Sequence, residues 1–264
     1  MKSIYKKINI SYTLLFLLFI SLLSGLFKDI IVFVFIIVIH EIGHIISSFY
    51  YGWKIDNIRF SICGGYLTYN QELEKPFIEE FVIAISGFLA QLILFIFCAF
   101  LYKNNVINSR FAYLLTKYNV SVFIFNLLPI IPLDGSKVLD IILNNIFPYK
   151  KSLVILSVIS LFTCIAIFFL LIYNNIKIEY SYIIMLMFLI KNIYKYYKNI
   201  PYMHFRFLLE RYIKPLNTTK YKIILGSNLS KMYKNKKHIF IINGKKVKES
   251  LILSKKFDYF NKVW

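Results

Sequence analysis

Residues 30–53 read IIVFVFIIVIHEIGHIISSFYYGW, an apolar run long enough to cross a bilayer as one helix. Its only imidazole or charged side chains are His40, Glu41 and His44. Helix residues four apart share a face, so both imidazoles can reach a single Zn²⁺, while Glu41 lies about 100° round the helix. In zinc hydrolases with this H-E-x-x-H pattern the glutamate is the general base. The stretch therefore predicts zinc chemistry inside a membrane.

A metal-free alternative exists for these three side chains, which could form a hydrogen-bonded cluster that packs helices. A carboxylate near the middle of a spanning helix costs roughly 2.5–3.5 kcal/mol on insertion scales. Ionisable residues at that depth are therefore usually functional, and this cost favours the metal site.

The composition excludes a soluble domain of this length. The chain is 58% hydrophobic and 19% aromatic, with a mean hydropathy of +0.62, which is typical of a multispanning membrane protein. We predict six spans. The predicted spans are 8–27, 30–53, 81–102, 118–133, 152–176 and 180–190. Four are clear and two are weaker. Of the weaker two, 118–133 can be extended by 111–115, and 180–190 needs its flanking lysines to snorkel.

Basic residues are concentrated in the tail. Of the net charge of +19, the segment 191–264 supplies 18 Lys and Arg against three acidic residues. The positive-inside rule places this tail in the cytoplasm, and six spans place the N-terminus there too, although Lys103, Arg110 and Lys117 then lie outside, against the rule. Anionic lipid and topology explain the lysines without nucleic acid, since no groove-reading motif accompanies them.

The cysteines and the N-terminus give no sign of other chemistry. Cys63, Cys98 and Cys164 are odd in number and scattered, so we interpret them as packing residues. The N-terminal apolar stretch follows a basic region without a small-residue cleavage site, which predicts a retained first span.

A zinc hydrolase usually has three protein ligands, so the two histidines need a partner. His204 and His238 lie in the basic tail, whereas Asp134 ends the run NLLPIIPLDG that starts at Asn126. Its two prolines break a helix, and a broken helix at membrane depth needs protein or a water-filled cavity around it, which can aim a carboxylate inward. Alternatively, Asp134 caps the following helix. Beside the H-E-x-x-H motif, the ligand interpretation is favoured.

These two motifs together resemble the site-2 proteases, a family of intramembrane zinc metalloproteases. The resemblance implies a single zinc ion held by His40, His44 and Asp134, with Glu41 as the catalytic base. It also implies that Asn126 lines the substrate site.

The resemblance is incomplete at two places. Where the family often has G-P-x-x-N in its third span, this chain keeps Gly87 but has Phe88 and Gln91, and Ser136 replaces the glycine that usually follows Asp-Gly. We interpret Gly87 as a point of close helix packing.

Residues 55–69 predict a β-hairpin, because β-forming residues flank the pair Gly64-Gly65. In the family this region resembles a re-entrant sheet beside the active site. We expect its edge, including the two glycines, to bind an extended substrate by strand addition.

The segment 198–264 predicts a small α+β domain after a transmembrane protease domain of residues 1–197. Strands are expected near 223–229 and 237–245, and a helix near 248–257. This order resembles one degenerate CBS module, a regulatory domain. The fold class is thus an all-α polytopic membrane protein with a re-entrant hairpin and a cytoplasmic α+β tail.

The tail and the compact span layout resemble the sporulation branch of the family. That resemblance implies a membrane-associated pro-sigma factor similar to pro-sigma-K as substrate, membrane inhibitor proteins as partners, and the outer forespore membrane as location. It also implies adenine nucleotide (ATP) at the CBS-like module, and it leaves homo-oligomer formation open.

Two other functions fit the H-E-x-x-H motif. One is a membrane zincin of the prenyl-protein protease type, which usually takes a downstream glutamate as third ligand. The other is a zinc-dependent membrane scaffold without proteolytic activity, which would not need Glu41 as a base.

Overall fold

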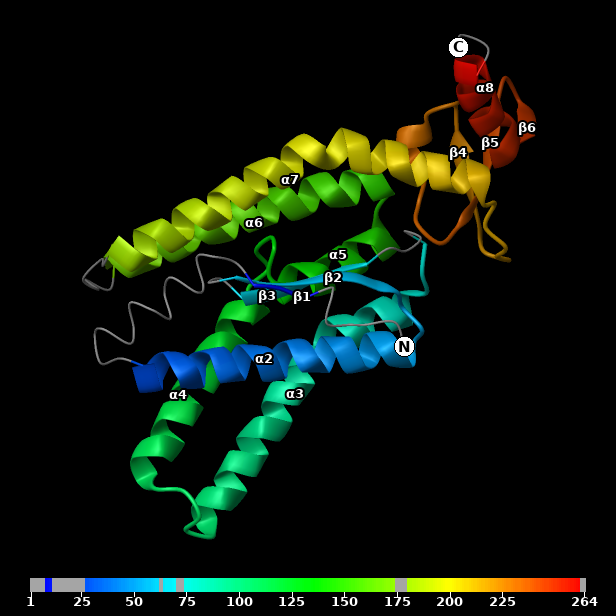
Figure 1. Cartoon of the computed structure of the whole chain (residues 1–264). Coiled ribbons are helices and arrows are strands. Elements are labelled where there is room, and N and C mark those ends of the chain that lie inside the picture. Colours follow the sequence, from blue (N-terminus) through cyan, green and yellow to red (C-terminus); the bar gives the residue numbers. More distant parts are fainter. Residues whose placement is uncertain (1–7, 11–26, 62–63, 70–73, 174–179, 262–264) are drawn as a thin grey trace. The chain divides into compact units, whose positions relative to one another are not determined.

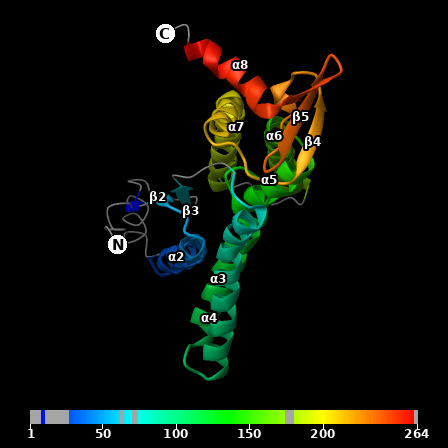
Figure 2. The ribbon, with the colours of Figure 1, turned by 90° about the vertical axis from the view of Figure 1, so that its right-hand side faces the viewer.

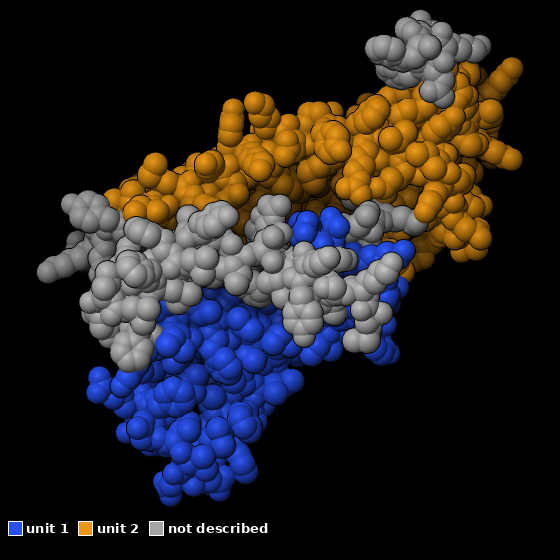
Figure 3. Space-filling model, in the orientation of Figure 1, with its two compact units in different colours: residues 1–71, 78–128 blue, residues 72–77, 129–264 orange. Residues whose placement is uncertain are grey.

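The computed structural model describes residues 8–10, 27–61, 64–69, 74–173 and 180–261 (Figure 1). The chain forms two compact units, coloured separately in Figure 3. The first comprises residues 1–71 and 78–128, and the second comprises 72–77 and 129–264.

The described residues of the first unit include the helices α2 (Phe27–Tyr50), α3 (Phe77–Lys103) and α4 (Ser109–Leu127). Their shared core consists of buried apolar residues from all three helices: Val32, Ile36, Ile37, Cys98, Leu115 and Val122. Side-chain hydrogen bonds hold both ends of α2. Tyr118 donates its hydroxyl to Asp29 over 2.8 Å, and the Trp53 indole donates to Glu79 over 3.0 Å. The helix that carries the H-E-x-x-H motif is therefore bonded to α4 near its start and, through Trp53 just beyond its end, to α3.

A small sheet accompanies these helices, with strand order β1 (Ile8–Ile10), β2 (Ile55–Ser61) and β3 (Gly64–Tyr69). Strands β2 and β3 are antiparallel, which confirms the predicted hairpin, and β3 lies next to α2. Gly64 and Gly65 lie at the start of β3, opposite Ser61 and Phe60.

Strand β1 corrects the start of the first predicted span. Ile8–Ile10 pair in parallel with β2, so their backbone groups are hydrogen-bonded in a sheet and not in a helix. Residues 11–26, the greater part of that predicted span, lie outside the described residues.

The second unit contains α5 (Asp134–Ile146), α6 (Tyr149–Tyr173) and α7 (Tyr180–Ile213), with α6 packed against both of the other helices. At its C-terminal end α7 joins a large core shared with the tail, in which Phe207, Leu208 and Phe240 are fully buried. The boundary proposed after Tyr197 falls inside α7. The division into a protease domain and a regulatory domain stays a prediction.

The tail folds into a sheet with strand order β4 (Tyr221–Leu225), β5 (Lys237–Ile242) and β6 (Lys245–Lys248), followed by α8 (Glu249–Asn261). Strands β4 and β5 are parallel, and β5 and β6 are antiparallel. Figure 2 shows α8 beside this sheet, and its residues Ile252, Leu253 and Phe257 enter the shared core. The predicted order of strand, strand, turn and helix agrees with these elements, while the likeness to a CBS module stays a prediction.

Three of the described helices are long and apolar enough to cross a membrane: Lys28–Tyr50, Phe77–Lys103 and Tyr149–Tyr173. Many large apolar side chains on them are exposed, for example Ile46 at 63%, Ile93 at 68% and Phe162 at 71%. Exposed apolar surface of this extent is typical of a face that contacts lipid or another protein. The count of six spans stays a prediction.

Arg211 near the end of α7 lies at the centre of a buried polar cluster in the second unit. Its guanidinium forms ion pairs with Glu74 and Glu249, and it donates to the main-chain oxygen of Lys236 over 2.8 Å. Glu249 also bonds the ring of His238, with 2.9 Å between Oε2 and Nδ1. Glu74 belongs to the segment that leads into α3, so this cluster attaches that segment to the tail.

We predict that Arg211→Met lowers the free energy of unfolding of the tail by about 3–5 kcal/mol, because it removes the buried guanidinium that pairs with the partly buried carboxylates of Glu74 and Glu249. Denaturant unfolding in detergent measures this change, with protease sensitivity of the tail as the readout. The matched control is Arg206→Met on the same helix, whose pair with Glu210 is exposed and is expected to contribute about 0–1 kcal/mol. Equal losses in the two variants would contradict the prediction.

Candidate metal centre

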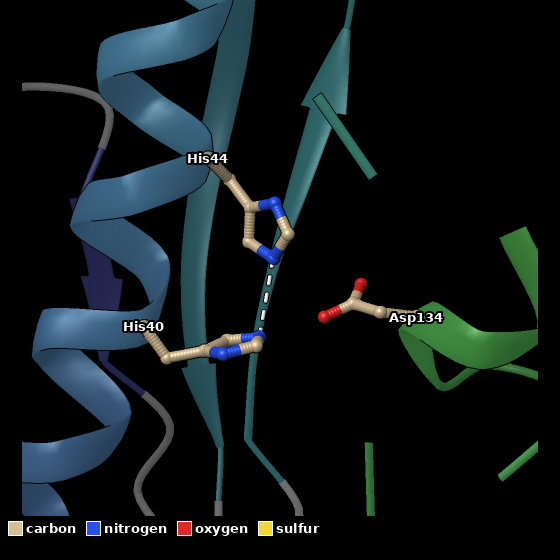
Figure 4. A group of neighbouring side chains, drawn as sticks. All are labelled: His40, His44 and Asp134. Carbon is tan, nitrogen blue, oxygen red and sulfur yellow. Dashed lines mark hydrogen bonds between the residues drawn. The ribbon is translucent and has the colours of Figure 1, made fainter. Parts of the chain in front are cut away.

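Three buried residues form a group that can hold a metal ion: His40, His44 and Asp134 (Figure 4). One ligand atom from each lies within 4.8 Å of the other two. Their exposed fractions are 2%, 3% and 6%. This is the ligand set that the sequence predicted, and its chemistry of two imidazoles and one carboxylate suits zinc.

The helical spacing of α2 brings the two imidazoles together as expected. His40 and His44 lie one turn apart, their ring centroids are 4.8 Å apart, and their Nε2 atoms are 3.1 Å apart. Both residues continue the buried stripe of Val32 and Ile36 along the same face. Figure 4 shows both rings projecting from the same side of α2.

The Nδ1 atoms of both rings face oxygen atoms of α3. Nδ1 of His44 is 2.7 Å from the main-chain oxygen of Ile83, and Nδ1 of His40 is 3.1 Å from Oε1 of Gln91. A main-chain oxygen only accepts hydrogen bonds, so the neutral His44 ring carries its proton on Nδ1 and its lone pair on Nε2. An imidazole in this tautomer offers the lone pair of Nε2 to a metal ion.

Gly87 on α3 allows the imidazoles to reach this position. A Cβ atom at Gly87 would lie 2.4 Å from Nε2 of His44 and 2.7 Å from Nε2 of His40. On α2, a Cβ at Gly43 would lie 2.4 Å from the main-chain oxygen of Ser86. The prediction of close helix packing at Gly87 agrees with this geometry, but nothing in the sequence pattern indicates that the neighbours are the imidazole nitrogens of His40 and His44.

Asp134 begins α5, directly after a loop that contains Pro129 and Pro132. The N-cap of the helix is Leu133, so Asp134 lies in the first turn and does not take the capping position. Its Oδ1 accepts a hydrogen bond from Lys137 over 2.7 Å. A carboxylate in a first turn is stabilised by the helix dipole, which suits a ligand that must stay ionised.

The loop before Asp134 is buried, as the broken helix required. Ile130, Ile131 and Leu133 are at most 6% exposed. The hydroxyl of Ser160 on α6 accepts a hydrogen bond from the Ile131 amide over 3.3 Å and lies 3.2 Å from the Pro129 oxygen. Sequence reasoning missed Ser160 and Lys137, because both act through contacts that only the folded chain brings about.

The remaining predicted site residues lie outside the metal group. Glu41 is 4% exposed and directly follows His40 on α2. Asn126 is partly buried in the last turn of α4, and Gly64 and Gly65 open β3. His238 contacts Glu249 in the tail, with 2.9 Å between Nδ1 and Oε2.

Known proteins resemble this chain in family, in sequence and in structure. The model of Peptidase family M50 matches residues 29–108 and 102–172, which together make up more than half of the chain. This chain belongs to peptidase family M50. The match includes both segments that supply the metal group, so the M50 assignment and the geometry agree on the site-2 protease family of intramembrane metalloproteases.

Individual M50 relatives support the same assignment. The chain is 31% identical over 206 residues to the Stage IV sporulation protein FB of Bacillus subtilis, which covers 78% of this chain and 71% of that protein. It is 32% identical over 120 residues to a zinc metalloprotease of Methanocaldococcus jannaschii, which covers 44% of this chain and 34% of that protein. A solved site-2 protease from Methanocaldococcus jannaschii superposes with a TM-score of 0.55 at 26% identity, covering 71% of this chain and 89% of that one.

We predict that Gly87→Ala lowers zinc affinity about 10–100-fold, because the added methyl group displaces the ligating rings. Zinc bound to the purified protein, titrated against a chelator, measures the effect. Leu89→Ala is the control, since that side chain is 50% exposed on the same helix and its loss should leave zinc binding unchanged. Wild-type affinity in a folded Gly87→Ala protein would rule out the close approach described above.

Proposed function

We propose that this protein is a zinc endopeptidase that performs regulated intramembrane proteolysis. The observation that carries the proposal is the buried group of His40, His44 and Asp134, with Glu41 next to it on α2. Family membership gives the reaction class, and the geometry supplies ligands and a base for it.

The proposed reaction divides between the metal and Glu41. When bound, zinc supplies a Lewis acid that polarises the scissile carbonyl group. Glu41 takes a proton from the attacking water and then transfers it to the leaving amine. Because the bilayer core supplies no water, the site needs a polar path that opens to the cytoplasm.

Substrate is proposed to bind as an extended strand along the outer edge of β3. In the part of the sheet that is described, β2 has partners on both sides and β3 pairs only with β2. A helical substrate has its peptide bonds already hydrogen-bonded, whereas an added strand presents them. In this proposal Gly64 and Gly65 allow close backbone approach and Asn126 positions the scissile peptide.

The proposed substrate is a membrane-associated pro-sigma factor similar to pro-sigma-K, processed during sporulation. Support comes from the resemblance to a relative whose name assigns it to sporulation. From the same resemblance we propose membrane inhibitor proteins as partners and the outer forespore membrane as location. The proposed topology has six spans with both termini in the cytoplasm. Homo-oligomer formation is open.

The tail is proposed to regulate the enzyme as a degenerate CBS-like domain. It contains a pocket of about 590 Å³ between the sheet and α8. Three lysines contribute to its lining, together with Ser227 and Asn243: Lys245, Lys255 and Lys256. Such a lining suits a phosphate-bearing ligand, so adenine nucleotide binding here stays a prediction.

The alternative zinc functions are less well supported. A zincin of the prenyl-protein protease type takes a glutamate as third ligand, but the third member of this group is Asp134. A metal-binding scaffold does not require Glu41 to be buried directly beside the ligands. The geometry therefore favours the site-2 protease reaction.

Co-expression with a panel of pro-sigma and anti-sigma factors tests the proposal. We expect at least one candidate to be cleaved, and Glu41→Gln to reduce cleavage by at least about 100-fold while the protein keeps its zinc, because only the base is lost. Glu210→Gln, at an exposed ion pair of α7, is the control and should cleave normally. Undiminished cleavage by Glu41→Gln would overturn the proposed mechanism, and no cleavage of any candidate would overturn the proposed substrate class.

A further inference from the structure

Gln91 connects the metal centre to a neighbouring helix. The residue lies on α3 and is 1% exposed. Its Oε1 is 3.1 Å from Nδ1 of His40, and its Nε2 donates to the main-chain oxygen of Asn119 on α4 over 3.4 Å. The Asn119 side chain donates in return to the main-chain oxygen of Gln91 over 3.1 Å. The amide is therefore held between α4 and a metal-binding imidazole.

The contact with Asn119 decides which way the amide faces. A main-chain oxygen only accepts, so the NH₂ group of Gln91 must point to Asn119 and its oxygen must point to His40. The oxygen then accepts a hydrogen bond from His40, which places the ring proton on Nδ1. Nε2, which lies 3.1 Å from the corresponding atom of His44, carries the lone pair.

We propose that Gln91 is a positioning residue of the metal centre, which fixes both the tautomer and the ring orientation of His40. Hydrogen-bond acceptors behind ligating histidines have this effect in metalloproteins. For His44 the corresponding acceptor is the main-chain oxygen of Ile83, which no substitution removes. For His40 the acceptor is the side chain of Gln91 on α3. This role falls to a residue that departs from the pattern usual in the family.

The proposal rests on zinc binding at His40, His44 and Asp134, and it goes beyond it by assigning a role to a residue that does not bind the metal. Gln91→Met and Gln91→Glu separate this role from simple space filling. Methionine keeps the length and volume of the side chain but removes the acceptor. Glutamate keeps the acceptor and loses the amide donor to Asn119.

The test is chelator competition for zinc with the full-length protein in detergent, with folding followed by circular dichroism. We expect Gln91→Met to weaken zinc binding about 10–100-fold and Gln91→Glu to stay within a few-fold of wild type. The control is Leu92→Met, because Leu92 is 51% exposed on the same helix. Wild-type affinity in folded Gln91→Met would overturn the proposal. If Gln91→Met does not fold, Gln91→Glu decides, because a tenfold loss despite the retained acceptor would overturn it and wild-type affinity would support it.

Failure of this inference is distinguishable from failure of the proposed function. A wild-type protein that binds no zinc contradicts the proposed function itself. Equal zinc affinity of the wild type and Gln91→Met contradicts only the role of Gln91.

Discussion

The close approach of α2 and α3 is the constraint on which the metal centre depends. Gly43 and Gly87 add no side chain of their own where the two helices meet, and a Cβ at either position would collide with the other helix, so the imidazoles of α2 can lie directly against α3. At this distance His44 reaches the main-chain oxygen of Ile83 and His40 reaches Gln91. These contacts set the protonation of both rings, and thus the direction of the lone pairs that a metal requires.

The carboxylate ligand depends on a second set of contacts, in the other unit. Pro129 and Pro132 interrupt the helix before Asp134, and the backbone groups this releases must be satisfied inside the protein. The hydroxyl of Ser160 on α6 accepts a hydrogen bond from the main-chain N–H of Ile131 in this loop. The same unit attaches the tail to the segment before α3 through Arg211 and Glu74.

The sequence predicted what depends on local pattern, and it missed what depends on contacts between distant segments. The spacing of His40 and His44 fixes their common face, and the prolines and Asp134 mark a helix break. By contrast, Gln91 read as a departure from a motif, because only the folded chain places its oxygen against His40. The hairpin limits were also predicted correctly, because β-forming residues on both sides of a glycine pair are a local pattern.

The central claim is that His40, His44 and Asp134 together hold one zinc ion. Zinc content of the purified full-length protein tests it most directly, comparing wild type with Asp134→Asn and with Asp140→Asn, a control on the same helix α5. We expect one zinc per chain in the wild type and in Asp140→Asn, and loss of zinc in Asp134→Asn, because a neutral amide is a poor ligand for zinc. Stoichiometric zinc in Asp134→Asn at wild-type affinity, or no zinc in the wild type, would contradict it.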